Sequence, residues 1–387
     1  MQPSSTSVIQ PLETALSHVW ARVLAVFGLL YVFLIGVNGL GNGFKSLGGN
    51  LLDAFFSATT DPFLGLMVGV LATTLVQSSS VTTSLIVAMV AAPENPLPLA
   101  NAVPMIMGAN IGTTVTNTIV SLAHMGRPDE FRRAFAVATC HDFFNFMAVV
   151  LFLPLEIATG FLRHLAESLT AVFSGVGGVK YDSPIKGAIK AGVTPLQKLS
   201  SIVSESSQIQ AVLLIVLCGV LIYVALFLLV KTMRSMLRSK VEGAVTGVLD
   251  RNALLAMIIG VIVTAMVQSS SITTSLLVPL AGAGIVTLAQ AFPVTIGANI
   301  GTTVTALLAS LAVSGENAAA GVTIALVHLF FNVSATAIIY PVERIRNLPL
   351  AAARKLADVA VTNRWAALAY VVSLFYLLPM LLAVLDR

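Results

Sequence analysis

The chain has 387 residues, of which 57% are hydrophobic and only 10% are charged, and its mean hydropathy is +0.94. Soluble domains are about 25% charged, so a chain this apolar cannot cover a water-facing surface. The composition excludes a soluble enzyme, a nucleic-acid-binding protein and a disordered scaffold, and it predicts an integral membrane protein. The net charge of +4 then reflects loop asymmetry. Cys140 and Cys218 lie in apolar runs, where we expect small hydrophobic residues rather than a disulfide pair.

The predicted spanning elements are apolar runs, most of them near the ~20 residues that a transmembrane helix needs. Two runs differ, because each is about 28 residues long and carries hydroxyl and amide side chains in its middle. Each arm of such a run offers about 13 residues, or ~20 Å, which is too short for ~30 Å of hydrocarbon. These two runs are therefore either re-entrant hairpins or long, broken spanning helices. The runs are 23–40, 64–91, 101–123, 134–153, 212–230, 254–281, 289–312, 321–342 and 365–384, with 64–91 and 254–281 as the two exceptions.

The sequence contains two internal copies of the same pattern. Residues 74–85 (TLVQSSSVTTSL) return as 265–276 (AMVQSSSITTSL), and 108–116 (GANIGTTVT) returns unchanged as 297–305. HDFFN at 141–145 returns as HLFFN at 328–332. Such repeats in a membrane protein are typical of transporter folds.

Clusters of Lys and Arg at 125–133, 231–251 and 344–364 are expected to share the cytoplasmic side. Two ordinary spans and one QSSS run separate the last two clusters, so that run has to return to its own side as a hairpin. We therefore predict an all-α integral membrane protein with two inverted-topology repeats, each with a re-entrant QSSS hairpin and three spanning helices, plus a C-terminal helix. The predicted units are repeat 1 (1–156), an interfacial helix and extracellular linker (157–211), repeat 2 (212–343), and an interfacial helix with the terminal helix (344–387).

Polar side chains without positive charge concentrate in these hairpins. From 46 to 126 and from 252 to 343 there is no Lys or Arg. A hairpin tip presents N–H groups that suit an anion, and carbonyl and hydroxyl oxygens that suit Na⁺. The alternative is that these Ser and Thr side chains bond their own helix or pack as small residues. A doubled run of four polar residues at bilayer depth is costly without a ligand or a network, which favours a shared binding site.

Other polar residues carry open alternatives. Asp142 is the only acid between Arg133 and Glu156, and its counterpart in the second copy is Leu329. An intramembrane carboxylate predicts a Na⁺ ligand or a proton carrier, and the alternative is an ion pair with Arg132 or Arg133. His141 and His328 are expected to be buried hydrogen-bonding residues, and Gly112 and Gly301 serve either close helix packing or approach to the hairpin tip.

The paired QSSS motifs, MGANIGTTVTNTIV at 107–120 and FRRAFAVATCHDFFNFMAVVLFLPLE at 131–156 closely resemble the type II sodium-dependent phosphate cotransporter family. The resemblance implies an inverted-repeat fold in which both QSSS tips bind divalent phosphate and Na⁺ and alternate access across the membrane. In that family an acid at the position of Asp142 accompanies electrogenic transport. The segment 157–211 lacks the long disulfide-bonded loop of animal members, so the chain resembles a bacterial member.

The expected function is sodium-coupled import of HPO₄²⁻ across the plasma membrane (bacterial inner membrane), with phosphate, Na⁺ and the bilayer as partners and without nucleic acid or an obligate protein partner. The site is expected to be non-catalytic, with Na⁺ as its only metal. The residues expected to bind phosphate are Gln77, Ser78, Ser79, Ser80, Asn110, Ser269, Ser270 and Asn299. The residues expected to bind sodium are Asp142, Asn145, Thr113, Thr114, Gln268, Ser270, Ser271, Thr302 and Thr303.

Three alternatives remain at this point. An intramembrane serine hydrolase would use His141 and Asp142, but the second QSSS run has no matching acid because Leu329 replaces it. A passive anion channel would conduct without Na⁺. A sodium-coupled transporter of sulfate or arsenate would keep the mechanism and change the tetrahedral anion.

Overall fold

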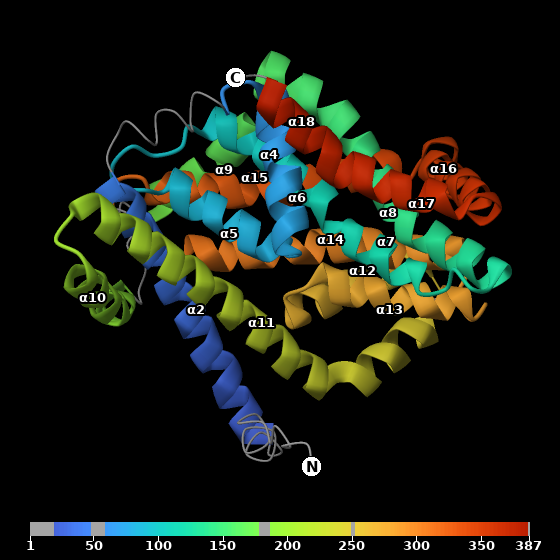
Figure 1. Cartoon of the computed structure of the whole chain (residues 1–387), viewed down its shortest axis with the longest axis horizontal. Coiled ribbons are helices and arrows are strands. Elements are labelled where there is room, and N and C mark those ends of the chain that lie inside the picture. Colours follow the sequence, from blue (N-terminus) through green and yellow to red (C-terminus); the bar gives the residue numbers. More distant parts are fainter. Residues whose placement is uncertain (1–18, 48–58, 178–185, 249–251, 386–387) are drawn as a thin grey trace, which may run out of the picture.

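The computed structural model describes residues 19–47, 59–177, 186–248 and 252–385 (Figure 1). Within those ranges every regular element is a helix. The helices of the first half are α2 (Val19–Leu47), α4 (Pro62–Val76), α5 (Ser79–Val90), α6 (Leu99–Thr113), α7 (Val115–Leu122), α8 (Pro128–Thr159), α9 (Phe161–Gly177) and α10 (Lys186–Val203). Those of the second half are α11 (Ser207–Val248), α12 (Ala253–Val267), α13 (Ser270–Gly282), α14 (Leu288–Ser310), α15 (Ala318–Ile339), α16 (Glu343–Thr362), α17 (Arg364–Val372), the π-helical turn η1 (Ser373–Leu377) and α18 (Leu378–Leu385).

Length and composition mark several of these helices as membrane spans. Within the described residues, six helical stretches are long and apolar enough to cross a bilayer, which confirms a multi-pass membrane protein. They are Ala21–Phe44, Pro128–Thr159, Ser207–Leu229, Leu288–Ser310, Ala318–Ile339 and Arg364–Leu382.

Small residues bring α2 against α11. A Cβ added at Gly39 would lie 2.5 Å from Sγ of Cys218, and one at Gly36 would lie 2.7 Å from Cγ1 of Ile222. In lipid, helices associate through such close packing, because the bilayer supplies no hydrophobic drive between them. Cys218 is thus a buried packing residue. It and Cys140 are both free thiols, as their apolar neighbours predicted.

The first arm of each QSSS run packs against the GANIGTT helix of its own copy. A Cβ at Gly108 of α6 would lie 2.0 Å from the carbonyl oxygen of Leu66 in α4, and one at Gly297 of α14 would lie 2.0 Å from that of Met257 in α12. The same close approach holds at Gly112 and Gly301, at 2.6 Å from a carbonyl oxygen of the facing arm. These glycines therefore serve close helix packing, one of the two roles considered for them.

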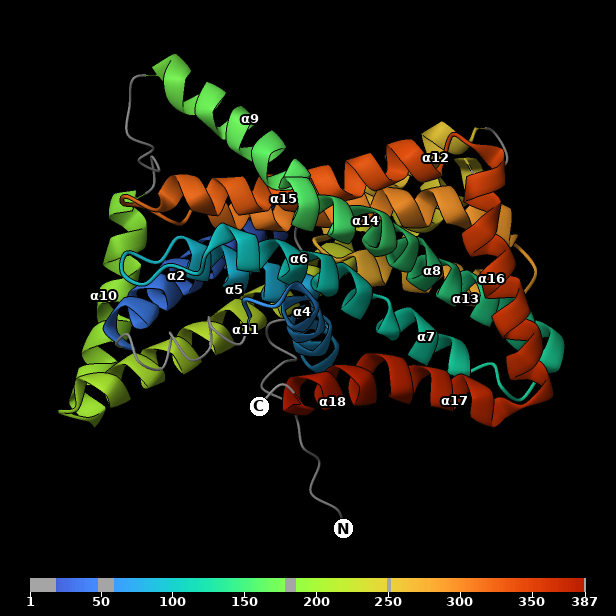
Figure 2. The same cartoon turned by 90° about the horizontal axis from the view of Figure 1, so that it is seen from above.

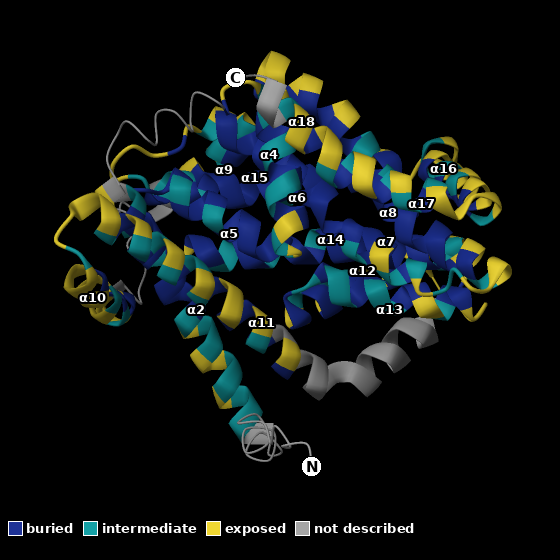
Figure 3. Cartoon of the chain, viewed as in Figure 1, coloured by how far each residue is buried: buried dark blue, intermediate teal, exposed yellow. Residues whose placement is uncertain are grey.

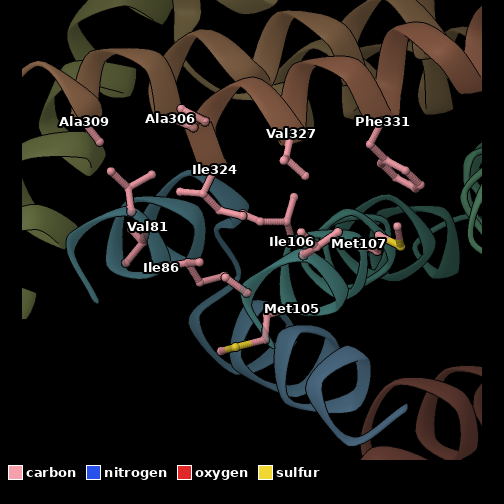
Figure 4. Close-up of a cluster of buried hydrophobic side chains, with 14 of the residues drawn as sticks. Val81, Ile86, Met105, Ile106, Met107, Ala306, Ala309, Ile324, Val327 and Phe331 are labelled. Carbon is pink, nitrogen blue, oxygen red and sulfur yellow. The ribbon is translucent and has the colours of Figure 1, made fainter. Parts of the chain in front are cut away.

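The second arm of each run packs against the other copy. Helix α5 contacts α14 and α15, while α13 contacts α7 and α8. Figure 4 shows this core, in which Val81 and Ile86 of α5 lie with Met105, Ile106 and Met107 of α6 beneath α14 and α15. Figure 3 shows that buried residues concentrate on the central helices α5, α6, α8 and α14. The two copies therefore share one hydrophobic core.

Two helices lie crosswise at opposite ends of the long axis (Figure 2). Helix α16 runs across one end, where Arg132 of α8 forms an ion pair of 3.2 Å with Asp358, and α10 lies at the other end. One helix was expected within 157–211 and another at the start of 344–387, and α9 (Phe161–Gly177) and α16 (Glu343–Thr362) lie there. The predicted linker 157–211 also contains α10, a helix that the sequence analysis did not anticipate.

The C-terminal segment packs back onto the first half. Tyr370 of α17 contacts Asp142 and Phe135 of α8, and α18 and η1 contact α4, the first arm of the QSSS run. The terminal helix is therefore part of the bundle around the first copy.

Two predicted elements differ from the structure. The run 101–123 was expected to form one spanning helix, but it breaks at Thr114 into α6 and α7, whereas its counterpart α14 is continuous. The basic segment 231–251 was treated as a loop, but α11 continues through it to Val248, because Lys, Arg, Glu and Met all favour a helix. The predicted boundaries there followed hydropathy, which does not distinguish a polar helix from a loop.

Candidate functional site

The first QSSS motif is a sharp break between two helices. Helix α4 ends at Val76, Gln77 adopts a left-handed conformation (φ 56°), and Ser78 is extended before α5 begins at Ser79. The Gln77 amide nitrogen donates to the carbonyl oxygen of Thr74 at 2.5 Å, and the Ser78 hydroxyl accepts from the backbone N–H of Val81. The last carbonyls of one helix and the first N–H groups of the next thus lie at one point, with opposite dipole ends together.

The second motif repeats this break. Gln268 is left-handed (φ 57°), Ser269 is extended, and the Gln268 amide donates to the carbonyl of Ala265. The hydroxyl of Thr264 donates to that of Thr273 at 2.9 Å. An uninterrupted helix would separate residues nine apart by ~13 Å, so the second arm folds back along the first.

The two breaks lie in direct contact. The hydroxyl of Ser80 donates to the backbone carbonyl of Gln268 at 3.2 Å, joining residues 188 positions apart in the sequence. The Thr305 hydroxyl donates to Oε1 of Gln268 at 2.8 Å, and the equivalent Thr116 donates to Oε1 of Gln77 at 3.0 Å. Sequence positions from both copies therefore build one polar cluster.

The residues expected to bind phosphate fall into two groups by their exposure to solvent. Gln77 is exposed and Ser78 and Ser269 are half-buried, so they are reachable at the break. The other members are buried inside the cluster, namely Ser79, Ser80, Asn110, Ser270 and Asn299.

A buried network of amides and imidazole joins α8 to both GANIGTT helices. Nε2 of His141 lies 2.7 Å from Oδ1 of Asn299, and Nδ2 of Asn299 donates to Oδ1 of Asn145 at 2.7 Å. Nδ2 of Asn145 donates in turn to the carbonyl of Asn110 at 2.9 Å. His141 is thus a buried hydrogen-bonding residue, in the role expected of it. The asparagines Asn110 and Asn299 lie on opposite helices with Asn145 between them.

Asp142 is fully buried and makes no ion pair with any residue that the structure describes. Its Oδ2 accepts from the Tyr370 hydroxyl at 2.7 Å and from Thr118 at 3.5 Å, while Oδ1 has no partner. The alternative ion pair is wrong, because Arg132 binds Asp358 and Arg133 donates to the carbonyls of the last turn of α13. The side chain of Asn145, expected to accompany Asp142, is instead bonded within the asparagine network.

The remaining residues expected to bind sodium are hydroxyls close to the breaks. Thr113 and Thr302 donate to carbonyls one turn earlier in their own helices, at 2.8 and 3.1 Å, and Thr114 and Thr303 donate three residues back. A donating hydroxyl keeps two acceptor lone pairs, so these contacts leave its oxygen able to coordinate a cation. Ser270 is buried and Ser271 is half-buried, both in the first turn of α13 beside Gln268.

Several residues of the cluster escaped the sequence analysis. Thr116 and Thr305 are equivalent positions in the repeated GANIGTTVT block, so the repeat itself was a usable signal. Asn117 accepts from Thr274 and Ser275 at 2.9 Å each, although the second copy has Ala306 at its position. Tyr370, in the terminal helix, carried no signal in the sequence.

Comparison with known proteins identifies one family and several relatives. A family model described as Na⁺/Pi-cotransporter matches residues 32–179 and 220–345. The chain is 35% identical to sodium-dependent phosphate transport protein 2A of Rattus norvegicus over 96% of this chain and 69% of that protein. It is 33% identical to sodium-dependent phosphate transport protein 2B of Homo sapiens over 93% of this chain and 64% of that protein. The chain thus spans about two thirds of the length of these relatives. No solved structure is a significant match.

Proposed function

The chain belongs to the Na⁺/Pi-cotransporter family, and from that membership we propose that it couples the entry of inorganic phosphate, as HPO₄²⁻, to the entry of Na⁺. The family consists of transporters and not of enzymes, which removes the serine-hydrolase alternative. The single observation that carries the proposal within this chain is the contact between the two QSSS breaks, where Ser80 of one meets Gln268 of the other.

The chemistry of the cluster favours co-binding of an anion and a cation. The segments 46–126 and 252–343 contain no Lys or Arg, so no side-chain cation there can neutralise a dianion. An unscreened dianion in a low-dielectric site costs many kcal/mol. Co-bound Na⁺ supplies that compensation, and because each ion then needs the other, their fluxes are coupled.

In the proposed mechanism the N–H groups at the starts of α5 and α13 and the QSSS hydroxyls hold phosphate. The carbonyl and hydroxyl oxygens around Gln268, Thr302 and Thr303 hold one Na⁺. The two helix pairs are re-entrant hairpins in inverted repeats, and rocking of one repeat against the other opens the site to each side in turn. The protein acts in the plasma membrane, in a bacterial host the inner membrane.

In this proposal Asp142 binds a second Na⁺, in the first half of the site. A buried carboxylate that makes no ion pair, with one oxygen unpartnered, suits a Na⁺ ligand. With HPO₄²⁻, the Na⁺ near Gln268 and the Na⁺ at Asp142 sum to zero charge, so the electrogenic transport that we propose carries a third Na⁺. The net positive charge then moved inward draws on the membrane potential, about 2.3 kcal/mol per charge per 100 mV.

Uptake of labelled phosphate into proteoliposomes tests the function. We expect uptake that depends on an inward Na⁺ gradient and that an inside-negative potential accelerates. Equal uptake with Na⁺ and with choline would contradict symport and favour the channel alternative. Competition by sulfate and arsenate ranks the tetrahedral anions, and preferred uptake of labelled sulfate would reassign the substrate.

A further inference from the structure

The terminal helix reaches a fully buried carboxylate of α8, that of Asp142. The Tyr370 hydroxyl donates to Oδ2 of Asp142 at 2.7 Å, across 228 positions of sequence. Tyr370 also lies outside the residues that the family model matches, which end at 345. We propose that Tyr370 is a positioning residue for a cation bound at Asp142 and that α17 forms one wall of that site. This inference rests on the proposed Na⁺-coupled function.

Packing holds the Tyr370 ring in place. Its ring lies edge-on to that of Phe135 in α8, with centroids 6.5 Å apart, and to that of Phe375, at 6.1 Å. Phe375 belongs to the π-helical turn η1 and is fully buried. Side chains locked by packing present their polar atoms in one geometry, so the hydroxyl is pre-organised toward the carboxylate.

The two oxygens of Asp142 have different surroundings. Oδ2 accepts from Tyr370 and, more weakly, from Thr118 at 3.5 Å, whereas Oδ1 has no partner although the residue is fully buried. Buried polar atoms are normally satisfied, so an orphaned carboxylate oxygen indicates a missing ligand. The Tyr370 hydroxyl therefore fixes Oδ2 and leaves Oδ1 to coordinate a cation.

The terminal helix also contacts the QSSS region. Helix α18 and η1 pack on α4, whose last residue, Val76, directly precedes Gln77. The same helix thus touches the carboxylate through Tyr370 and the first arm of the phosphate site through its C-terminal part.

Replacing the hydroxyl alone tests the proposal. Tyr370→Phe keeps both ring contacts, and we expect the Na⁺ concentration for half-maximal phosphate uptake to rise about tenfold, the effect of losing a hydrogen bond to a charged group. Half-saturation by phosphate at saturating Na⁺ should not change. The matched control is Tyr376→Phe, a half-buried tyrosine six residues further along the same terminal segment, which should leave both values unchanged. An unchanged Na⁺ dependence in Tyr370→Phe would overturn the proposal.

A second comparison separates positioning from general packing. In an Asp142→Asn background, Tyr370→Phe should have no further effect on Na⁺ dependence, because the carboxylate on which it acts is gone. An equal loss in both backgrounds would show a structural role and refute the assignment.

Thermal unfolding in detergent decides the point independently of phosphate transport. Na⁺, compared with choline, should raise the Tm of the unmodified protein, and Tyr370→Phe should need about tenfold more Na⁺ for the same shift. Absence of phosphate uptake in the unmodified protein would defeat the proposed function while this measurement still tests Tyr370. The same Na⁺ dependence of Tm in both proteins would overturn the positioning role.

Discussion

The two QSSS breaks share their backbone conformation and most of their sequence, yet they differ in access. Gln77 is exposed, whereas Gln268 is 7% exposed and its backbone carbonyl accepts an additional hydrogen bond from Ser80. The GANIGTT helices differ as well, because α6 ends at Thr113 and its counterpart α14 runs on to Ser310. Nearly identical sequences have therefore settled into two environments, one more open than the other.

The buried network shows the same asymmetry. His141, Asn145 and Asn299 are joined by hydrogen bonds of 2.7 Å. Their counterparts in the other copy are His328, Asn332 and Asn110, in which the Asn332 and Asn110 amides donate only to carbonyls of their own helices. Oδ1 of Asn332 has no partner, whereas Oδ1 of its counterpart Asn145 accepts from Asn299. The sequence permits the network in both copies, and the structure forms it in one.

This difference has a direct meaning for a transporter with internal repeats. If the two copies exchange conformations when the site opens to the other side, the hydrogen-bonded network should form in the other copy and be lost from the first. We therefore expect His328 and Asn332 to bond Asn110 in the opposite-facing state.

The largest effect should follow from removing the glutamine at the buried break. Gln268→Ala leaves the hydroxyl of Thr305 without its acceptor in a buried site, and we expect phosphate uptake to fall by about 100-fold and stability by about 1–3 kcal/mol. Gln77→Ala, at the exposed break, should lower uptake with little change in Tm. Uptake in proteoliposomes and thermal unfolding in detergent measure the two effects, and equal losses of stability would remove the distinction between the breaks.

Asp142 marks the sharpest difference in chemistry, since Leu329 stands at its position in the second copy. Asp142→Gly should leave part of the phosphate uptake intact but abolish its response to an imposed voltage, because the cation at Asp142 is no longer carried and HPO₄²⁻ with the two remaining Na⁺ is neutral. Current recording or uptake at defined potentials measures this. A retained voltage response would show that another residue carries the charge, with Asp142→Asn as the variant that preserves the helix.

A smaller effect, on stability, should distinguish Asn299 from its counterpart Asn110. Asn299→Ala removes bonds to His141 and Asn145, and we expect a loss of about 1–3 kcal/mol. Asn110→Ala removes one amide bond to its own helix and should cost less, because the Asn110 backbone carbonyl still accepts from Asn145. Thermal unfolding of both variants gives the order, and an inverted order would mean that the second network is the one formed in solution.

Much of the candidate site was predictable from sequence because its residues occur twice. The repeat singled out Gln77, Gln268 and the following serines, and the structure brings those positions together at two helix breaks. The partners of Asp142 were not predictable. Two arginines close to it in sequence were plausible partners, but Arg132 and Arg133 bind groups on other helices, and the actual partner, Tyr370, lies 228 residues away.

The sequence by itself determined the class of protein, the repeat and the chemical type of the site, because composition, identity between copies and the lack of Lys and Arg are properties of the chain alone. The tertiary structure decided which of two nearly identical breaks is open, which asparagine network is formed and what holds Asp142. Those outcomes depend on contacts between helices far apart in sequence. Nearly identical motifs with different neighbours therefore reach different hydrogen-bonded arrangements of lowest free energy.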